Sequence, residues 1–263
     1  MISTWFDTGM VGPVDIISST EADTLRTSLE HEIESVPEDR RADTLYYKSH
    51  LVYGAVDTLA FHPATIAVAV ALLGPDVLLW DSNVPIKPAL TAKRFTPHQD
   101  ATYWGLEPPE EAATIWVALT PSTVANGCIC FALGSHRHGQ LPHRREARDD
   151  VMLRRGQELD PASGPLAPVE LRPGQATAHH PFTAHASGPN GTDEPRIGVV
   201  LVYVSARVRT PGRSDGAIRV AGSENHHFSH EVRVAAPASP AALAAHAAAT
   251  DAMRARVVPP ASS

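Results

Sequence analysis

The run IGVVLVYV, residues 197–204, is the longest of six short β-rich runs that begin after residue 75. The other five are DVLLW (76–80), TAKRFT (91–96), TIWVALT (114–120), CICFAL (128–133) and PVELR (168–172). Pro, Gly, Asn or Asp separates each run from the next. Short runs divided by turn residues are typical of a sandwich or barrel, and not of alternating βαβ units. We therefore expect a mainly β core over about residues 76–210.

Helical patterns flank this core. Ser19 or Thr20 can cap a helix whose apolar face consists of Leu25, Leu29 and Ile33. A second helix is predicted over residues 63–73, with Gly74 as its stop. The Ala- and Pro-rich tail predicts a third helix near the C-terminus. The fold class is thus mainly β with flanking helices.

Length and charge limit the other expectations. The 263 residues suit one domain over 1–263, with a helical part at about 15–75 and a tail at about 235–263. The net charge of −7 argues against nucleic-acid or membrane partners. No apolar run approaches the roughly 18 residues that span a bilayer, and the first residues do not resemble a signal peptide. We expect a cytoplasmic protein, either a monomer or a homodimer.

The stretch TPHQDATYW, residues 96–104, contains the chemistry-bearing pair His98 and Asp100. On a strand, residues two apart project to the same face, so the imidazole and the carboxylate would point the same way. They would then form two thirds of a 2-His-1-carboxylate site. An HxD pair alone is a weak signal, because most such pairs are solvated loop residues. The third ligand must come from far along the chain, and three histidines qualify: His179, His180 and His185.

Arg196 enters the longest apolar run, where an unpaired buried charge is costly. A carboxylate cosubstrate held bidentately would be a partner for the guanidinium. A local ion pair with Asp193 or Glu194 is the alternative. The polar segment at about 135–165 is either a lid over the site or an ordered surface loop.

Three motifs in this order resemble the phytanoyl-CoA dioxygenase (PhyH) family of Fe(II)/2-oxoglutarate-dependent oxygenases. They are HQD at 98–100, the stretch from Asn126 to Gly139 ending in GSHRHG, and HASGPN followed by Arg196. The resemblance extends over about residues 15–230. It implies a double-stranded β-helix, that is, a cupin-like jelly roll. It also implies that the metal-binding, catalytic residues are His98, Asp100 and His185.

The resemblance assigns further roles around the iron. Arg196 would bind the distal carboxylate of 2-oxoglutarate, and Ser187 would donate a hydrogen bond to it. A lysine is often recruited in this family, and both Lys48 and Lys87 remain candidates. Gln99 and Asn190 match family positions near the substrate. His180 would either support the ligands or be a hydrogen-bonded core histidine.

The implied reaction uses Fe(2+), 2-oxoglutarate and O₂, releases succinate and CO₂, and proceeds through a ferryl species. Because Asp100 is retained, the iron has no vacant ligand position for a halide. We expect hydroxylation of a small polar metabolite in bacterial specialised or catabolic metabolism. Desaturation, cyclisation or rearrangement at the same iron is an alternative, as is a non-catalytic metal-binding jelly roll.

The candidate substrate-binding residues suit two different classes of substrate. Tyr103, Trp104 and Trp116 would form aromatic walls suited to a cationic substrate if they face the iron. Aromatic residues in a β-rich core more often serve packing, which is the alternative. Asn83 and the arginines of the 144–155 segment would suit an anionic substrate. The sequence leaves this choice open.

Overall fold

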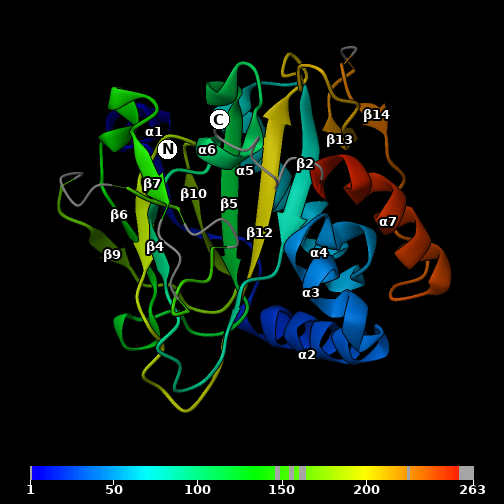
Figure 1. Ribbon diagram of the computed structural model, residues 1–263, viewed down its shortest axis with the longest axis horizontal. Helices are drawn as coiled ribbons and strands as arrows, with labels where there is room; N and C mark the ends of the chain where they lie inside the picture. Colours follow the sequence, from blue (N-terminus) through cyan, green and yellow to red (C-terminus); the bar gives the residue numbers. More distant parts are fainter. Residues whose placement is uncertain (1, 146–148, 154–156, 160–163, 224–225, 255–263) are drawn as a thin grey trace.

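Two facing β-sheets with helices outside them make up the computed structural model, which describes residues 2–145, 149–153, 157–159, 164–223 and 226–254 (Figure 1). The strands are β1 (Met10–Asp15), β2 (Val77–Asn83), β3 (Ile86–Lys87), β4 (Phe95–His98), β5 (Ala112–Ala118), β6 (Ile129–Phe131), β7 (His143–Arg145), β8 (Gln157–Leu159), β9 (Ala167–Val169), β10 (Gln175–His179), β11 (His185–Ser187), β12 (Arg196–Ser205), β13 (Gly216–Ala221) and β14 (Ser229–His230). The helices are α1 (Ile2–Thr8), α2 (Ser19–Ser35), α3 (Glu38–Tyr46), α4 (Gly54–Ala60), α5 (Pro63–Leu73), α6 (Ala101–Trp104) and α7 (Pro240–Arg254), with 3-10 turns η1 (Ser49–Leu51), η2 (Pro109–Glu111), η3 (Val124–Asn126) and η4 (Ser135–His138).

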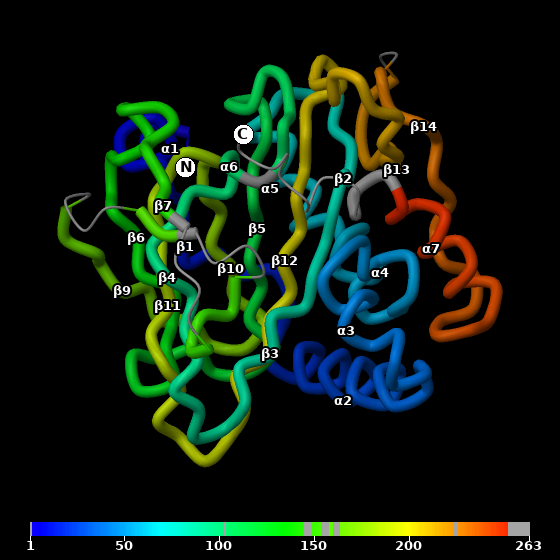
Figure 2. The backbone as a smooth tube through the Cα atoms, viewed as in Figure 1, coloured from blue at the N-terminus to red at the C-terminus, as the bar shows by residue number. Residues whose placement is uncertain are grey.

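The larger sheet has the order β1-β10-β5-β12-β2-β13-β14, and β3 also pairs with β12. The smaller sheet has the order β4-β11-β6-β9, while β7 and β8 form a separate hairpin. Figure 2 shows β4, β11 and β6 grouped on the side of the molecule away from α2, α3 and α4. Two sheets facing each other in this way form a jelly roll, so the predicted mainly β fold with flanking helices is confirmed.

The two faces of the larger sheet have different partners. On β5, Ile115 and Val117 pack in one buried cluster with side chains of α2, α4 and α5. The alternate residues Thr114 and Trp116 face the space between the sheets, where they line a cavity. Because side chains alternate along a strand, one apolar run thus supplies both the core and the site.

The predicted helix at 63–73 is confirmed as α5, and Gly74 follows it with φ of 93°. The predicted cap of α2, Ser19 or Thr20, was wrong by one or two residues, because the cap is Ser18 and the helix begins at Ser19. The Ser18 hydroxyl accepts from the Glu21 backbone, and the Glu21 carboxylate accepts from the Ser18 backbone. This reciprocal pair satisfies two helix-end donors, which a cap at Ser19 or Thr20 would not.

The run TAKRFT forms less of a strand than predicted. Only Phe95–His98 belongs to β4, and the residues before it make the isolated bridges Thr91–Asn190 and Arg94–Val151. The segment from 174 to 198 contains two strands that were not among the six predicted runs, β10 and β11. These strands turn out to contain the remaining residues of the metal site.

No single helix of the described chain combines the length and apolarity needed to cross a membrane. The pair α4 and α5, bent by 50°, passes that test only when taken together. Both helices contribute to the buried cluster against the larger sheet.

Candidate metal centre

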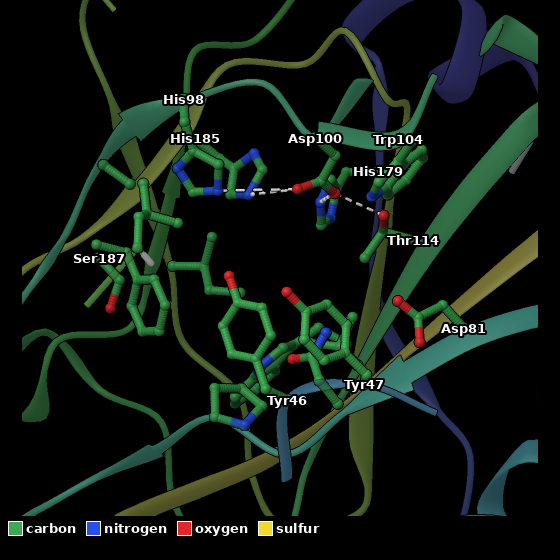
Figure 3. Close-up of a pocket in the computed structure, with 18 of the residues that line it drawn as sticks. Tyr46, Tyr47, Asp81, His98, Asp100, Trp104, Thr114, His179, His185 and Ser187 are labelled. Carbon is green, nitrogen blue, oxygen red and sulfur yellow. Dashed lines mark hydrogen bonds and ion pairs between the residues drawn. The ribbon is translucent and has the colours of Figure 1, made fainter. Parts of the chain in front are cut away.

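Side chains from two distant parts of the sequence converge between the sheets (Figure 3). His98 ends β4 and His185 begins β11, and the two residues are direct partners in the antiparallel register. The Asp100 Oδ1 atom lies 3.8 Å from His98 Nε2 and 3.7 Å from His185 Nε2. One ligand atom from each residue lies within 4.8 Å of the other two. This spacing allows all three to hold one metal ion.

Asp100 reaches this position by a route that differs from the predicted one. Its backbone is helical, with φ of −61° and ψ of −40°, and it precedes α6 instead of continuing β4. The expectation that His98 and Asp100 share one face of a strand is therefore wrong. The carboxylate meets the imidazole because the chain turns after β4.

Both histidines are held in one orientation by a hydrogen bond to the backbone carbonyl two residues earlier. His98 Nδ1 lies 2.7 Å from the Thr96 carbonyl, and His185 Nδ1 lies 3.0 Å from the Thr183 carbonyl. A carbonyl only accepts, so each Nδ1 carries the proton and each Nε2 presents its lone pair. Burial lowers the pKa of both imidazoles, which favours the neutral form that a metal requires.

The second oxygen of Asp100 is held by two neighbours on the larger sheet. The Thr114 hydroxyl donates to Oδ2 at 2.6 Å, and His179 Nε2 lies 3.1 Å from the same atom. Thr114 and His179 are register partners on β5 and β10. His179, one of the three candidate ligands, thus supports the carboxylate.

These contacts also explain the charge state of Asp100. Burial acts to raise its pKa, but the neighbouring imidazoles of His185 and His179 lower it by more. The pKa of this carboxyl therefore lies well below its usual range. The group is an anion ready to bind a cation.

Arg196, at the start of β12, is 1% exposed and lines the same cavity. Its Nη1 donates to the Gly127 carbonyl at 2.6 Å and to Ser187 Oγ at 3.3 Å, and its guanidinium carbon lies 5.2 Å from the Trp116 ring centre. Burial lowers the pKa of Arg196 to about 10, so the side chain remains charged at neutral pH.

Arg196 is also incompletely bonded. Its buried Nε has no hydrogen-bond partner in the described chain, and no ion pair there joins it to Asp193 or Glu194. The alternative of a local ion pair is thus not observed. A guanidinium with a buried donor left over fits a carboxylate ligand.

The two candidate lysines have different surroundings. Lys87 is the register partner of Arg196, and its ammonium donates to Ser187 Oγ at 2.5 Å and to the Gly188 carbonyl. Burial and the nearby Arg196 charge lower the pKa of Lys87 to about 7. Lys87 and Ser187 thus lie together with Arg196 at one end of the site.

Lys48 lies elsewhere, and neither lysine is among the described residues that line the cavity. Its fully buried ammonium donates to the carbonyls of Trp80 and Gly216 at 2.8 and 2.9 Å, and it pairs with Glu231 at 2.8 Å. The structure therefore brings Lys87, and not Lys48, to Arg196.

A cavity of about 180 Å³ lies beside the triad, and its lining includes three of the residues considered for the substrate, Asn83, Trp104 and Trp116. The side chain of Tyr103 lies outside the described residues. Leu153, from the segment considered as a lid, also lines the cavity. Much of that segment, at 146–148, 154–156 and 160–163, falls outside the part of the chain that the structure describes.

Gln99 and Asn190 are not among the residues that line the cavity. The Gln99 amide donates to the carbonyls of Gly139 and Phe182 at 2.9 and 2.7 Å, and its oxygen accepts from the Leu141 backbone at 2.7 Å. Asn190 likewise donates to backbone carbonyls. Both side chains hold loops around the site through these hydrogen bonds.

His180 packs against Trp5 and His136, with ring centres 5.5 and 5.3 Å apart. It makes no contact with Asp100, because His179 occupies that place. Sequence reasoning also missed several residues that line the cavity, among them Tyr46, Tyr47, Trp80 and Asp81. The available signal was Asp81 itself, an acid in the apolar run VLLWDSN.

Comparison with known proteins adds an independent result. Residues 9–198 match the family model described as phytanoyl-CoA dioxygenase (PhyH). Among solved structures, the chain is similar to a non-heme monooxygenase, ThoJ, with a TM-score of 0.87 and 34% identity, over 97% of this chain and 96% of that chain. A nickel complex of ThoJ matches with a TM-score of 0.84 and 32% identity, over 97% and 98% of the two chains.

Two curated relatives show similarity over shorter regions. A probable phytanoyl-CoA dioxygenase of Caenorhabditis elegans is 30% identical over 126 residues, which are 47% of this chain and 40% of the relative. A 1-deoxypentalenic acid 11-beta-hydroxylase of Streptomyces arenae is 29% identical over 181 residues, 58% of this chain and 60% of the relative. The chain thus matches about half the length of these curated relatives.

Proposed function

Because the chain belongs to the phytanoyl-CoA dioxygenase family, we propose that it is an Fe(II)/2-oxoglutarate-dependent oxygenase that hydroxylates a small molecule. The observation that carries the proposal is the convergence of His98, Asp100 and His185 beside the buried, incompletely bonded Arg196. The triad fits the metal, and the guanidinium fits the far carboxylate of the diacid.

The donor set suits iron. Two neutral imidazole nitrogens and one carboxylate oxygen form the 2-His-1-carboxylate site of non-heme Fe(II) oxygenases, which leaves coordination positions open. With Fe(II) and 2-oxoglutarate bound, the site would supply an oxidant from O₂ that removes hydrogen from the substrate, with succinate and CO₂ as co-products.

The protein's own residues orient the reactants. Thr114 and His179 engage Asp100 Oδ2, so that Oδ1 alone faces the two histidines. Arg196 holds the distal carboxylate of 2-oxoglutarate, with Lys87 and Ser187 beside it. Trp116 packs against the guanidinium, whose carbon lies 5.2 Å from the ring centre. Each contact places a group before the reaction, which lowers the entropic part of the barrier.

Hydroxylation is the simplest outcome and agrees with the name of the Streptomyces arenae relative. The cavity of about 180 Å³ supports a small substrate. Desaturation, cyclisation or rearrangement would use the same ligands. A bacterial specialised or catabolic pathway, a cytoplasmic location and a monomeric or homodimeric state belong to the same proposal.

The test is succinate release from 2-oxoglutarate by the purified protein with Fe(II) and O₂. We expect slow succinate formation without a substrate, because oxygenases of this kind turn over uncoupled. Asp100→Ala should abolish it and sharply weaken iron binding. Succinate formed equally well by Asp100→Ala would remove Asp100 from the ligands, and no succinate from the wild type would favour a non-catalytic metal-binding protein.

A further inference from the structure

Two cysteines lie next to the backbone carbonyl that holds Arg196. Cys128 and Cys130 are the two cysteines of the chain, and both are free thiols. Cys128 is 1% exposed, whereas Cys130 is partly exposed. The proposed reaction gives neither thiol a role, so their place beside the cosubstrate end needs another explanation.

Both thiols project from the same side of β6. Ile129 and Phe131 belong to the same buried cluster as Trp116, between the two sheets. Side chains alternate along a strand, so Cys130 projects to the opposite side, and Cys128, two positions earlier, projects the same way. The two thiols are hydrogen-bonded to each other, and the Cys130 sulfur lies 3.8 Å from the Cys128 carbonyl oxygen. They form a dithiol on the side of the smaller sheet away from the larger one.

The two thiols differ in reactivity. The hydrogen bond from Cys128 lowers the pKa of Cys130 to about 7, and the charge of Lys87 acts in the same direction. The same hydrogen bond, together with burial, raises the pKa of Cys128, which stays a neutral thiol. Peroxides react with thiolates, and cysteines sensitive to oxidation are typically accessible thiolates with a second cysteine beside them. Cys130 and Cys128 match these two positions.

The Gly127 carbonyl connects the dithiol to the cosubstrate end. It accepts from Arg196 Nη1 at 2.6 Å and from Ser187 Oγ at 2.7 Å. Cys128 follows directly, and its backbone N–H donates to the Thr123 carbonyl at 2.8 Å. A movement of the Cys128 backbone therefore displaces an acceptor of the guanidinium.

The backbone around Gly127 is packed too closely to absorb such a movement. Gly127 has a φ of +73°, in the left-handed region, and a Cβ atom there would collide with the Gly188 carbonyl. That carbonyl in turn accepts from the Lys87 ammonium. A shift of Gly127 is thus passed on to the groups beside Arg196.

A disulfide between Cys128 and Cys130 would cause this shift. At about 3.3 Å per residue, positions two apart on an extended chain are about 6.6 Å apart. This separation is near the upper limit of about 6.8 Å for the Cα atoms of a disulfide, so the backbone must contract for the bond to close. A bond formed under such strain is readily reduced again.

We propose that Cys128 and Cys130 are a site of reversible oxidation by peroxide, where disulfide formation displaces the Gly127 carbonyl and weakens 2-oxoglutarate binding at Arg196. The Cys130 thiolate attacks hydrogen peroxide, which gives a sulfenic acid and releases hydroxide. The Cys128 thiol then displaces the sulfenic oxygen as water and forms the S–S bond. In sum, two thiols and one peroxide give one disulfide and two waters. The effect on the cosubstrate rests on the proposed function, whereas the disulfide itself does not.

The first part of the test is chemical. The metal-free protein is treated with hydrogen peroxide in the presence of a chelator, and catalase then removes the peroxide. We expect the monomer to lose the mass of two hydrogen atoms and both thiols to stop reacting with N-ethylmaleimide. Dithiothreitol should restore both. Because the chain has only these two cysteines, the mass change identifies the bond.

The second part measures the consequence. Oxidised and reduced protein are loaded with Fe(II) without O₂ and titrated with 2-oxoglutarate, followed by the iron–2-oxoglutarate absorption. We expect the oxidised protein to bind 2-oxoglutarate about tenfold more weakly, because an acceptor of the Arg196 guanidinium has moved. Iron affinity should be unchanged. Hydrogen exchange of the backbone amides in residues 123–131 should be faster in the oxidised protein.

The matched controls are Cys128→Ser and Cys130→Ser, because each leaves one thiol and cannot form the intramolecular bond. Both variants should bind 2-oxoglutarate as the reduced wild type does, before and after peroxide treatment. A loss of affinity in both variants equal to that of the wild type would mean that peroxide acts elsewhere, and would overturn the proposal.

Three further results would overturn it: two unreacted thiols, a covalent dimer as the sole product, or a disulfide that leaves 2-oxoglutarate affinity unchanged. Failure of the proposed function is read from other signals, namely a reduced protein with no iron–2-oxoglutarate absorption and no succinate. In that case the mass and hydrogen-exchange measurements on the metal-free protein still decide whether the disulfide forms and displaces Gly127.

Discussion

Replacing Thr114 by Val tests whether the hydrogen bonds to Asp100 Oδ2 prepare the metal site. Valine has the shape of threonine but no hydroxyl. The change removes the 2.6 Å bond to Oδ2 and leaves the bond from His179 at 3.1 Å. The carboxylate then rotates more freely, and its second oxygen can approach the metal. We expect weaker metal binding from an otherwise intact fold.

The size of the effect follows from the bond. A hydrogen bond to a charged group is worth about 1.5–3 kcal/mol, and the charged group here, the Asp100 side chain, is 17% exposed. If most of this hydrogen-bond energy is lost from metal binding, the metal affinity falls by roughly 10- to 100-fold. Mutation of residues that hydrogen-bond to metal ligands typically lowers metal affinity by this amount. Because the hydrogen bond from His179 remains, we expect the loss of metal affinity to lie near the lower end of this range.

The assay is an anaerobic titration with Fe(II) or Ni(II) in competition with a chelator. Thr177→Val is the matched control, because Thr177 is also 2% exposed and its hydroxyl has no hydrogen-bond partner among the described residues. The control should bind metal as the wild type does. Wild-type affinity in Thr114→Val, or an equal loss in both variants, would refute the reasoning.

Three further predictions concern the cosubstrate and the loops. Arg196→Leu should weaken 2-oxoglutarate binding about 100-fold and leave the iron affinity little changed. Titrations followed by the iron–2-oxoglutarate absorption measure both. An unaltered affinity for 2-oxoglutarate would mean that another residue binds its distal carboxylate. Affinity for 2-oxoglutarate should fall as pH rises through about 7, because Lys87 then loses the charge that the carboxylate favours. Lys87→Met should flatten that dependence, and a slope that persists would assign it to another group. Gln99→Leu should lower the free energy of unfolding by about 2–4 kcal/mol in urea, because it leaves buried backbone groups without partners; unchanged stability would contradict the contacts described.

Several features could be predicted from the sequence because they depend on the residue types themselves and on their near neighbours. Apolar runs between turn residues indicated strands, and the Pro63–Leu73 helix with Gly74 behind it was predicted to the residue. The residue types of a 2-His-1-carboxylate site could also be named, because ligand preference belongs to the side chain itself. The resemblance of three motifs to one family then selected His185 among three histidines. None of these inferences needed to know which strands pair.

Strand register and chain turns decided the rest. Asp100 left the strand on which it was expected, and His179, 79 positions along the chain, reached its second oxygen. Lys48 and Lys87 are indistinguishable by residue type. Yet the Lys48 ammonium donates to the Trp80 carbonyl in β2, whereas Lys87 is the register partner of Arg196. Asp81 faces the cavity only because an extra residue shifts β2 against β12. Such contacts join residues far apart in the chain, and a one-residue shift in pairing changes which side chains meet, so no local pattern determines them.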